Sequence, residues 1–386
     1  MAKATEASNP ESTENSALDT QIAQNASGAF ADWYGTMRAR ARATVYQHFY
    51  TQGTDEGGGV PLGEKEALKT GDSRVKLSVD GIEREYRVHI PPHAPDDHLP
   101  VVVVLHGTSP QYKTAIEESI STMGFNKEAD KNGFIAAYPI AQTRTFEYHP
   151  LLRNNYNVNF YAWNAPGISL VAPDSSPAPP KDDVRFLQSM VDDLRSRSTA
   201  AGDKLYGIGY SGGAWLLGKA AADPRFSFAG VASVKGTMTD IPNAPQIEAA
   251  GKKHMSSSDG KGDSTSAGTT YIGVHGLSDP VLPYSGGSGS FAVGYQRVGL
   301  AGHGTDDSKP FAQARYWSRV NGCLGNPTVK QEGEIEIREQ KHCAGKSVEE
   351  IFVPGGHEWP AQINLGSSQV EFSQFLLTQL GIAKAR

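Results

Sequence analysis

The stretch of sequence that decides the fold is residues 204–218, KLYGIGYSGGAWLLG. Its apolar beginning predicts a short β-strand, and the apolar run from Ala214 onward predicts a helix. Between them lies Gly209-Tyr210-Ser211-Gly212-Gly213, the only G-x-S-x-G of the chain. This turn places Ser211 at the N-terminus of the helix, where free N–H groups and the helix dipole can hold an anion. The alternative is a glycine-rich turn whose serine only caps the helix.

A serine on a sharp turn between a strand and a helix is the nucleophile elbow of α/β-hydrolases. A serine hydroxyl needs a base, and in this fold an acid and then a histidine follow it in the chain. Asp279 follows the apolar segment 271–275, and His357 follows the segment 351–353 and two glycines. We therefore expect Ser211, Asp279 and His357 to form a catalytic triad. The alternatives are an Asp-Pro turn at 279 and a surface histidine at 357.

The loop that would hold an oxyanion follows the run Pro100 to Leu105, whose valines are typical of a strand buried on both faces. In this fold, one backbone donor comes from such a loop and the other from the residue after the serine. We therefore expect the N–H groups of Thr108 and Gly212 to be the donors. His106 precedes the serine, which is the wrong order for the base, so we expect it to pack beneath the loop.

These segments together resemble the polyhydroxybutyrate depolymerase and feruloyl esterase-like group of α/β-hydrolases. The resemblance extends over roughly residues 75–385, with its motifs in the same order. The matching stretches are Leu105-His106-Gly107, Trp163-Asn164-Ala165, Asp182 to Leu187, Gly209 to Gly213, His275-Gly276 with Asp279-Pro280, Trp317 with Asn321-Gly322-Cys323, and Gly356-His357 with Trp359-Pro360.

The resemblance implies a serine carboxylic ester hydrolase that acts through an acyl-enzyme, uses Ser211, Asp279 and His357, and needs no cofactor. Tyr210, Trp163 and Trp359 stand in or next to its motifs, and we expect them to contact the substrate. The chain departs from many relatives in having Gly212 after the serine and no cysteine after the tryptophan-asparagine pair. A peptidase of the same fold and a catalytically inactive α/β-hydrolase that only binds are the alternatives.

Strands and helices alternate along most of the chain, which predicts an α/β fold of the α/β-hydrolase type, a doubly wound and mostly parallel sheet with helices on both faces. The sequence begins this domain with a hairpin that turns at Asp80-Gly81. Strands are expected near 101–105, 134–138, 204–208, 228–234, 271–275, 334–339 and 348–353, and helices near 114–131, 183–200, 212–222, 310–320 and 367–380. The segments 142–181 and 250–269 are expected to be irregular.

The chain divides into an N-terminal arm, residues 1–70, and a catalytic domain, residues 71–386. Within the arm, 1–28 is polar and expected to be disordered, 29–51 is expected to be a helix, and 52–70 is a glycine-rich linker. The helix is interpreted as a solvated, loosely docked segment, with a membrane or partner anchor as the alternative.

Cys323 and Cys343 are the only cysteines. From the residues alone they can be two free thiols of a reducing compartment. The resemblance favours a disulfide between them, because relatives carry a similar pair. A metal site is not expected, since the chain has neither H-E-x-x-H nor paired C-x-x-C motifs.

Composition limits the partners of the chain. Its formal net charge of −6 gives no basic footprint for nucleic acid. The chain contains no run of 18 or more apolar residues, so we expect no transmembrane helix. The polar start, residues 1–15, shows no secretory signal peptide, which favours the cytoplasm, whereas the family that the chain resembles is usually exported. The expected partner is an ester substrate, small or oligomeric, and the oligomeric state is left open.

Overall fold

The computed structural model describes residues 60–62, 66–92, 98–109, 111–148, 156–165, 182–236, 268–279, 281–282 and 312–384. The expected disorder of residues 1–28, the expected helix at 29–51 and almost all of the segment 250–269 lie outside these described residues.

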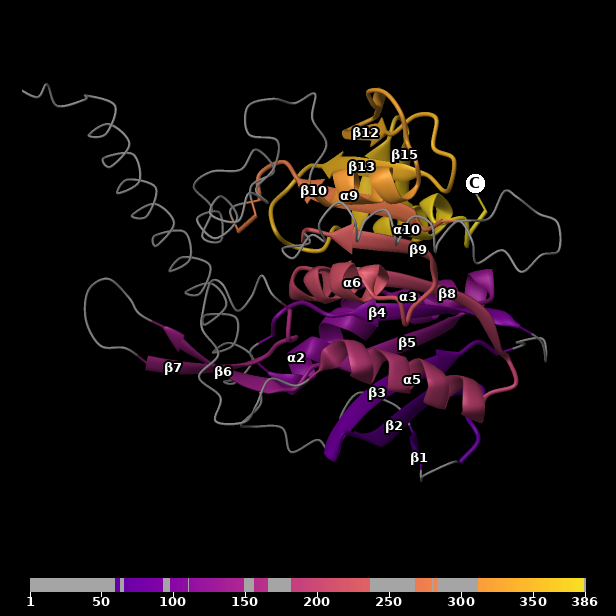
Figure 1. Ribbon diagram of the computed structural model, residues 1–386, viewed down its shortest axis with the longest axis vertical. Coiled ribbons are helices and arrows are strands. Elements are labelled where there is room, and N and C mark those ends of the chain that lie inside the picture. The colour runs from indigo at the N-terminus through magenta and orange to yellow at the C-terminus, as the bar shows by residue number, and fades with distance from the viewer. Residues whose placement is uncertain are drawn as a thin grey trace, which may run out of the picture.

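A sheet of 11 strands runs through the centre of the molecule (Figure 1). Its strands are β1 (Val60–Leu62), β2 (Gly71–Val79), β3 (Ile82–Ile90), β4 (Leu99–Leu105), β5 (Ile135–Ile140), β8 (Ala201–Tyr210), β9 (Phe228–Val234), β10 (Thr270–Gly276), β11 (Thr328–Glu332), β12 (Ile335–Glu339) and β13 (Val348–Val353). Their order in the sheet is β1-β2-β3-β5-β4-β8-β9-β10-β13-β12-β11. All neighbours from β5 to β13 pair in parallel, and antiparallel pairs flank them on both sides. The predicted mostly parallel sheet is therefore confirmed.

Helices cover both faces of the sheet (Figure 1). On one face, the buried apolar side chains of α5 (Asp183–Arg197), α6 (Gly212–Ala222) and α9 (Ala312–Val320) belong to the same apolar cluster as Val101 and Val103. On the other face, the buried apolar side chains of α3 (Phe125–Asn132) and α10 (Phe372–Gln379) belong to the same apolar cluster as Val102 and Val104. Successive side chains of a strand point to opposite faces, so a strand covered on both sides must be apolar throughout. The valine run of β4 meets this requirement.

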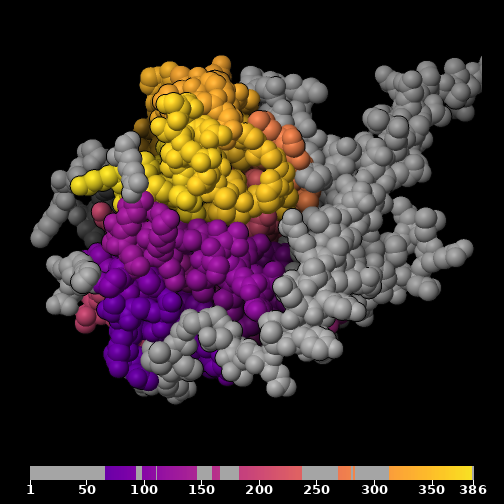
Figure 2. All heavy atoms as spheres, turned by 180° about the vertical axis from the view of Figure 1, so that it is seen from behind, coloured from indigo at the N-terminus to yellow at the C-terminus, as the bar shows by residue number. Residues whose placement is uncertain are grey.

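The C-terminal helix, α10, lies beside α3 and the turn that precedes it. Figure 2 shows the C-terminal region in yellow directly against the magenta region that contains α3. The hydroxyl of Ser373 in α10 donates a hydrogen bond to the carbonyl of Met123, just before α3. Segments some 250 residues apart therefore close one face of the sheet together.

The predicted hairpin at the start of the domain is also confirmed. The strands β2 and β3 are antiparallel, with Val79 opposite Ile82, so Asp80 and Gly81 form a two-residue turn. Both turn residues have positive φ, 53° and 77°, which is the requirement of a type I′ turn and explains the Asp-Gly pair.

Several elements differ from the sequence prediction. The segment 142–181 was expected to be irregular, but β6 (Thr143–Tyr148) and β7 (Tyr156–Tyr161) form an antiparallel pair in it. The last helix begins at Phe372, because a small hairpin of β14 (Gln362–Leu365) and β15 (Ser368–Glu371) precedes it. The residues of β7, YNVNFY, do alternate as a strand does, but the asparagines and prolines of the segment 142–181 are typical of loops and favoured the irregular prediction.

The helix expected at 114–131 is interrupted. It consists of α2 (Tyr112–Ile116), a π-helical segment η1 (Glu117–Thr122) and α3. Gly124 separates the last two with a φ of 69°, a left-handed conformation that ends a helix. The π-helical segment carries Glu118 next to the loop after β4, as described below.

The sheet begins earlier than the expected domain boundary at residue 71. The strand β1, within the expected linker, pairs in parallel with Ser73 to Val75 of β2. The side chain of Leu68 is buried, and its N–H donates a hydrogen bond to the carbonyl of Arg197 over 2.9 Å. A domain that started at residue 71 would therefore lack one edge strand and one core residue.

Candidate active site

The turn at Ser211 lies between β8 and α6 and is strained. Ser211 has φ 51° and ψ −118°, a conformation that residues other than glycine rarely adopt. A Cβ atom on Gly209 would lie 2.6 Å from the carbonyl oxygen of Gly213, and one on Gly213 would lie 2.4 Å from that of Leu105. Glycine at both positions therefore lets α6 approach the ends of β8 and β4 closely enough to form the turn.

Three side chains from distant parts of the chain meet at this turn. The Oγ atom of Ser211 lies 2.9 Å from Nε2 of His357, and Nδ1 of His357 lies 2.8 Å from Oδ2 of Asp279. The structure thus brings together the three residues that the sequence predicted as a triad. Because a carboxylate accepts the hydrogen bond from Nδ1–H, Nε2 is left with a lone pair that faces the serine hydroxyl.

The carboxylate of Asp279 is buried and fully oriented. Its side chain is 1% exposed, and its second oxygen accepts hydrogen bonds from the N–H groups of Val281 at 2.8 Å and Leu282 at 2.9 Å. A buried charge needs such partners. With both oxygens occupied, the carboxylate holds the imidazole of His357 in one orientation and one tautomer.

The loop after β4 is supported from below by a buried histidine. His106 is fully buried; its Nδ1 donates to the carbonyl of Gly107 over 2.6 Å, and its Nε2 accepts from the N–H of Ala141 over 3.1 Å. Burial lowers the pKa of His106 to about 4, so the ring is neutral at ordinary pH. The expectation that His106 packs beneath the loop agrees with these contacts.

A carboxyl group that the sequence analysis did not single out holds the same loop. Oε2 of Glu118 accepts a hydrogen bond of 2.8 Å from the N–H of Gly107. Burial raises the pKa of Glu118 to about 7, although the bond from Gly107 acts in the opposite direction. No motif marks Glu118 in the sequence, because its position depends on the π-helical turn that aims it at the loop.

The two expected oxyanion donors lie on these elements. Gly212 directly follows Ser211 and opens α6, where backbone N–H groups have no acceptor within the helix. Thr108 follows Gly107, whose own N–H is occupied by Glu118. The N–H of Thr108 is thus the next one along the loop, and its role as a donor stays a prediction.

The expected substrate contacts are not on open surface. Trp163 is fully buried, its Nε1 donates to the carbonyl of His106 over 2.8 Å, and the two rings are 4.9 Å apart. Trp359 is 8% exposed and packs edge-on against Phe125 and Phe372. Their large apolar rings fill the core under the loops, and contact of either ring with a substrate stays a prediction.

Tyr210 has a supporting position as well. Its side chain is 8% exposed, and its hydroxyl donates a hydrogen bond to the backbone carbonyl of His357. The residue before the serine thus holds the loop that carries the histidine. The short sequence motif contains Tyr210 without indicating this contact, which spans 147 residues.

The segment that contains Trp163 is fixed by a buried ion pair. Asp183, the first residue of α5, accepts a 2.6 Å hydrogen bond from Arg84, and the two side chains are 4% and 2% exposed. The other carboxylate oxygen of Asp183 accepts a hydrogen bond of 2.6 Å from the N–H of Asn164. These contacts join the Trp-Asn-Ala stretch to the start of α5.

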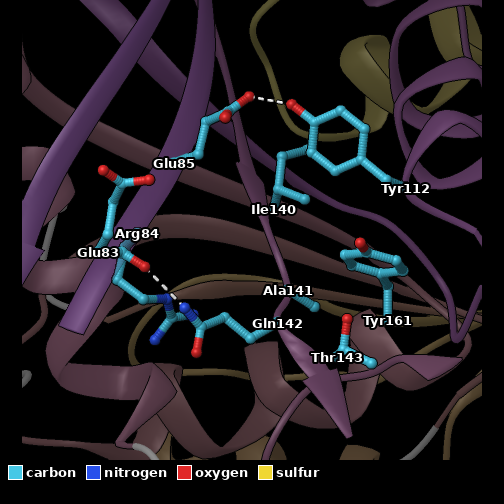
Figure 3. A pocket seen from close by; sticks show the side chains of 9 residues that line it. All are labelled: Glu83, Arg84, Glu85, Tyr112, Ile140, Ala141, Gln142, Thr143 and Tyr161. Atoms are coloured by element: carbon cyan, nitrogen blue, oxygen red, sulfur yellow. Dashed lines mark hydrogen bonds between the residues drawn. The ribbon is translucent and has the colours of Figure 1, made fainter. Parts of the chain in front are cut away.

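A cavity of about 380 Å³ lies beside the loop after β4 (Figure 3). Its lining residues lie at the start of β3 and the end of β5, and β5 lies on the side of β4 away from β8. Tyr161, in the wall of the cavity, exchanges two backbone hydrogen bonds with Ser109 of the loop after β4. The rings of Tyr112 and Tyr161 stand edge to face, 5.8 Å apart, on one wall. The lining residues are Glu83, Arg84, Glu85, Tyr112, Ile140, Ala141, Gln142, Thr143 and Tyr161.

Other sequence predictions concern the cysteines and metals. Cys323 and Cys343 are joined in a disulfide with an S–S distance of 2.04 Å. Among the described residues, no group of three or more histidine, cysteine or acidic side chains is arranged to hold a metal ion. Nor does any helix in the described ranges combine the length and apolar character of a membrane span.

Comparison with known proteins gives a relative for part of the chain. No family model matches it. A curated protein of Nocardia uniformis subsp. tsuyamanensis, the candidate esterase NocK, is 28% identical over 215 residues. The match covers 55% of this chain and 49% of NocK, so the chain spans about half the length of the curated relative it matches.

Solved structures with a similar arrangement include an acetyl xylan esterase from Aspergillus awamori and an IroE-like serine hydrolase from Shewanella oneidensis. The first has a TM-score of 0.45 at 15% identity, and the match covers 81% of this chain and 100% of that structure. The second has a TM-score of 0.39 at 13% identity, with 76% and 74% covered. At these values the likeness carries no conclusion about this chain. The observed strand order and the strand–turn–helix unit at Ser211 give this chain an α/β-hydrolase fold.

Proposed function

We propose that the protein is a serine carboxylic ester hydrolase that works through an acyl-enzyme. The observation that carries the proposal is the unbroken line of hydrogen bonds from Ser211 through His357 to Asp279, with distances of 2.9 and 2.8 Å. Each atom has the partner that its role requires, and the nucleophile lies at the N-terminus of a helix.

In the first half of the reaction, Nε2 of His357 takes the hydroxyl proton of Ser211 as the oxygen attacks the ester carbonyl. Asp279 stabilises the imidazolium that forms, and it does not take the proton itself. The N–H groups of Gly212 and Thr108 donate to the oxyanion of the tetrahedral intermediate. The intermediate then releases the alcohol, which receives its proton from His357, and the acyl group stays on Ser211.

In the second half, a water molecule replaces the alcohol. His357 takes a proton from this water as its oxygen attacks the acyl carbonyl, and the same two N–H groups hold the new oxyanion. Collapse of the intermediate returns the proton to Ser211 and releases the carboxylic acid. All groups required by both halves are side chains or backbone N–H groups of the protein.

The finer assignment, a depolymerase or feruloyl esterase type of enzyme, belongs to the same proposal and is supported by the order of the sequence motifs. The candidate esterase NocK supports ester hydrolysis in general. The cavity beside the loop after β4 gives room for a part of the substrate remote from the ester bond. Candidate substrates are hydroxyalkanoate oligomers, feruloyl or acetyl esters of plant polysaccharide, and small soluble esters.

The test combines a covalent probe with a substrate panel. A fluorophosphonate should label the wild-type protein at Ser211, and Ser211→Ala should remove both the label and the hydrolysis of nitrophenyl acetate, by about 10⁴-fold or more. Labelling without hydrolysis of any ester would contradict the proposal. Absence of labelling would indicate an inactive binding protein instead.

The panel then separates the substrate classes. It contains nitrophenyl esters of increasing chain length, methyl ferulate, hydroxybutyrate oligomers, acetylated xylan and a peptide. We expect hydrolysis of esters and not of the peptide. Preferred cleavage of the peptide would replace the esterase proposal with a peptidase of the same fold.

A further inference from the structure

Lys235, a buried lysine near the triad, has no part in the proposed mechanism. Lys235 follows β9 directly and is 2% exposed, the only buried lysine among the described residues. Its Nζ donates a hydrogen bond of 2.6 Å to the backbone carbonyl of Glu358, the residue after His357. Burial of a lysine is costly because the ammonium loses its hydration, so this position calls for an explanation.

The backbone of Lys235 is also unfavourable for its residue type. Its φ is 48°, in the left-handed region that glycine adopts far more easily than lysine. Its N–H donates to the carbonyl of Val274 over 2.8 Å, which fixes the conformation within the sheet. A glycine at this position would satisfy the same backbone bond without strain. The side chain of Lys235 is therefore the part that has a function.

The charged groups that face the ammonium come from two other elements. Asp279, after β10, and Glu358, after β13, both attract it, although burial has the larger effect and lowers the pKa of Lys235. Asp279 is the partner of His357, so the carboxylate that attracts the ammonium also belongs to the Asp–His pair. Glu358 itself is tied to the loop, because its carboxylate accepts the N–H of Gly356 at 2.9 Å.

The loop that carries His357 is thus held at two consecutive carbonyl groups. The hydroxyl of Tyr210 binds the carbonyl of His357, and the ammonium of Lys235 binds the carbonyl of Glu358. Tyr210 directly precedes Ser211, and Lys235 directly follows the neighbouring strand β9, whose last residue, Val234, pairs with Tyr210. Nucleophile and base are therefore positioned by the same pair of strands.

Resting on the proposed function, we propose that Lys235 is a positioning residue of the triad, whose ammonium fixes the His357 loop and whose positive charge beside Asp279 opposes protonation of His357. A carboxylate partner favours the imidazolium, and a nearby cation weakens this effect.

The test is the pH dependence of kcat/KM for a small nitrophenyl ester in Lys235→Met, which keeps the length of the side chain and removes its charge. We expect the acid limb to move to higher pH by about one unit, so that kcat/KM at pH 5 falls by about tenfold more than at pH 8. The matched control is Lys219→Met, an exposed lysine on α6, whose acid limb should stay in place. A uniform loss at every pH, with the limb unmoved, would overturn the inference.

Two further variants exclude a mere folding defect. Lys235→Gly removes the side chain and relieves the left-handed backbone, so it should fold and show the same shifted limb. Lys235→Arg retains a cation and should place the limb close to that of the wild type. A limb that moves as far in Lys235→Arg as in Lys235→Met would contradict a role for charge. Wild-type activity is measured in the same series, so that a failure of ester hydrolysis itself is seen separately.

Discussion

Two histidines follow parallel strands at the same edge of the sheet, and their surroundings differ in every respect. His106, after β4, is fully buried, and both ring nitrogens bind backbone groups. His357, after β13, is partly exposed, and its ring nitrogens face a carboxylate and a hydroxyl. The same side chain therefore supports a loop in one place and is suited to proton transfer in the other.

The difference lies in which form of the ring each environment stabilises. Burial lowers the pKa of His106 and leaves the ring neutral at all but acid pH, although the hydrogen bond to the carbonyl of Gly107 acts in the opposite direction. Asp279 offers His357 such a charge, and Ser211 offers it a proton. A histidine becomes a base when a buried carboxylate lies behind it and a hydroxyl in front of it. The predictions below test this division of roles.

The largest expected effect separates the two histidines by activity. His357→Ala should lower kcat/KM for a nitrophenyl ester by about 10⁴-fold or more, with little loss of folding stability, because the ring is at the surface of the core. His106→Gln should lower kcat/KM by only about tenfold, since an amide can keep one backbone bond, but should lower the free energy of unfolding by about 1–3 kcal/mol. Equal losses of activity would break the comparison.

The next effect concerns the carboxylate behind His357. Asp279→Asn should lower kcat by about 10³–10⁴-fold, because the amide NH₂ would donate to Nδ1 and favour the wrong tautomer of the ring. A matched control is Asp130→Asn, since Asp130 binds His89 over 2.8 Å in another Asp–His contact. Its activity should stay near that of the wild type. If Asp279→Asn were equally active, another acid would have to orient the base.

The third prediction uses the pH dependence of stability. The pKa of His106 is lowered from 6.5 to about 4, so between these pH values the unfolded chain binds the extra proton. Stability from this group is therefore complete above about pH 6.5 and is lost as the pH falls toward 4, by about 3 kcal/mol in total. Urea unfolding should show that His106→Gln loses stability less steeply than the wild type over this range. The exposed His342→Gln variant should keep the wild-type slope.

The smallest predicted effect on activity concerns the disulfide. It closes a loop between residues 20 positions apart and lies before β13, whereas His357 follows the other end of that strand. A double Cys323→Ser, Cys343→Ser variant should lose roughly 3 kcal/mol in urea unfolding. Its kcat/KM at 25 °C should remain within about twofold of the wild type. A large loss of activity would mean that the His357 loop depends on the distant end of β13.

Short-range patterns in the sequence determined the alternating strands and helices, the turn at Ser211 and the residues of the expected triad. The valines of β4 predict a strand covered on both faces because side chains alternate across a sheet. The glycines around Ser211 indicate a close approach of backbone that a Cβ would prevent. Such requirements act between neighbours in the chain and are therefore visible in the sequence.

The tertiary structure alone decided which side chains touch across the sheet. The tryptophans Trp163 and Trp359 belong to motifs, and both are buried beneath the loops. A motif does not show whether a residue supports a loop or contacts the substrate. Glu118 and Lys235 belong to no motif. The contact of Glu118 with Gly107 depends on a π-helical turn, and the contact of Lys235 with Glu358 depends on the position of Lys235 just after β9. A hydrogen bond between residues 123 positions apart, such as that of Lys235 with Glu358, leaves no periodic trace in the chain. Contacts of this kind exist only once the strands have been placed in order, so they are decided by topology and packing.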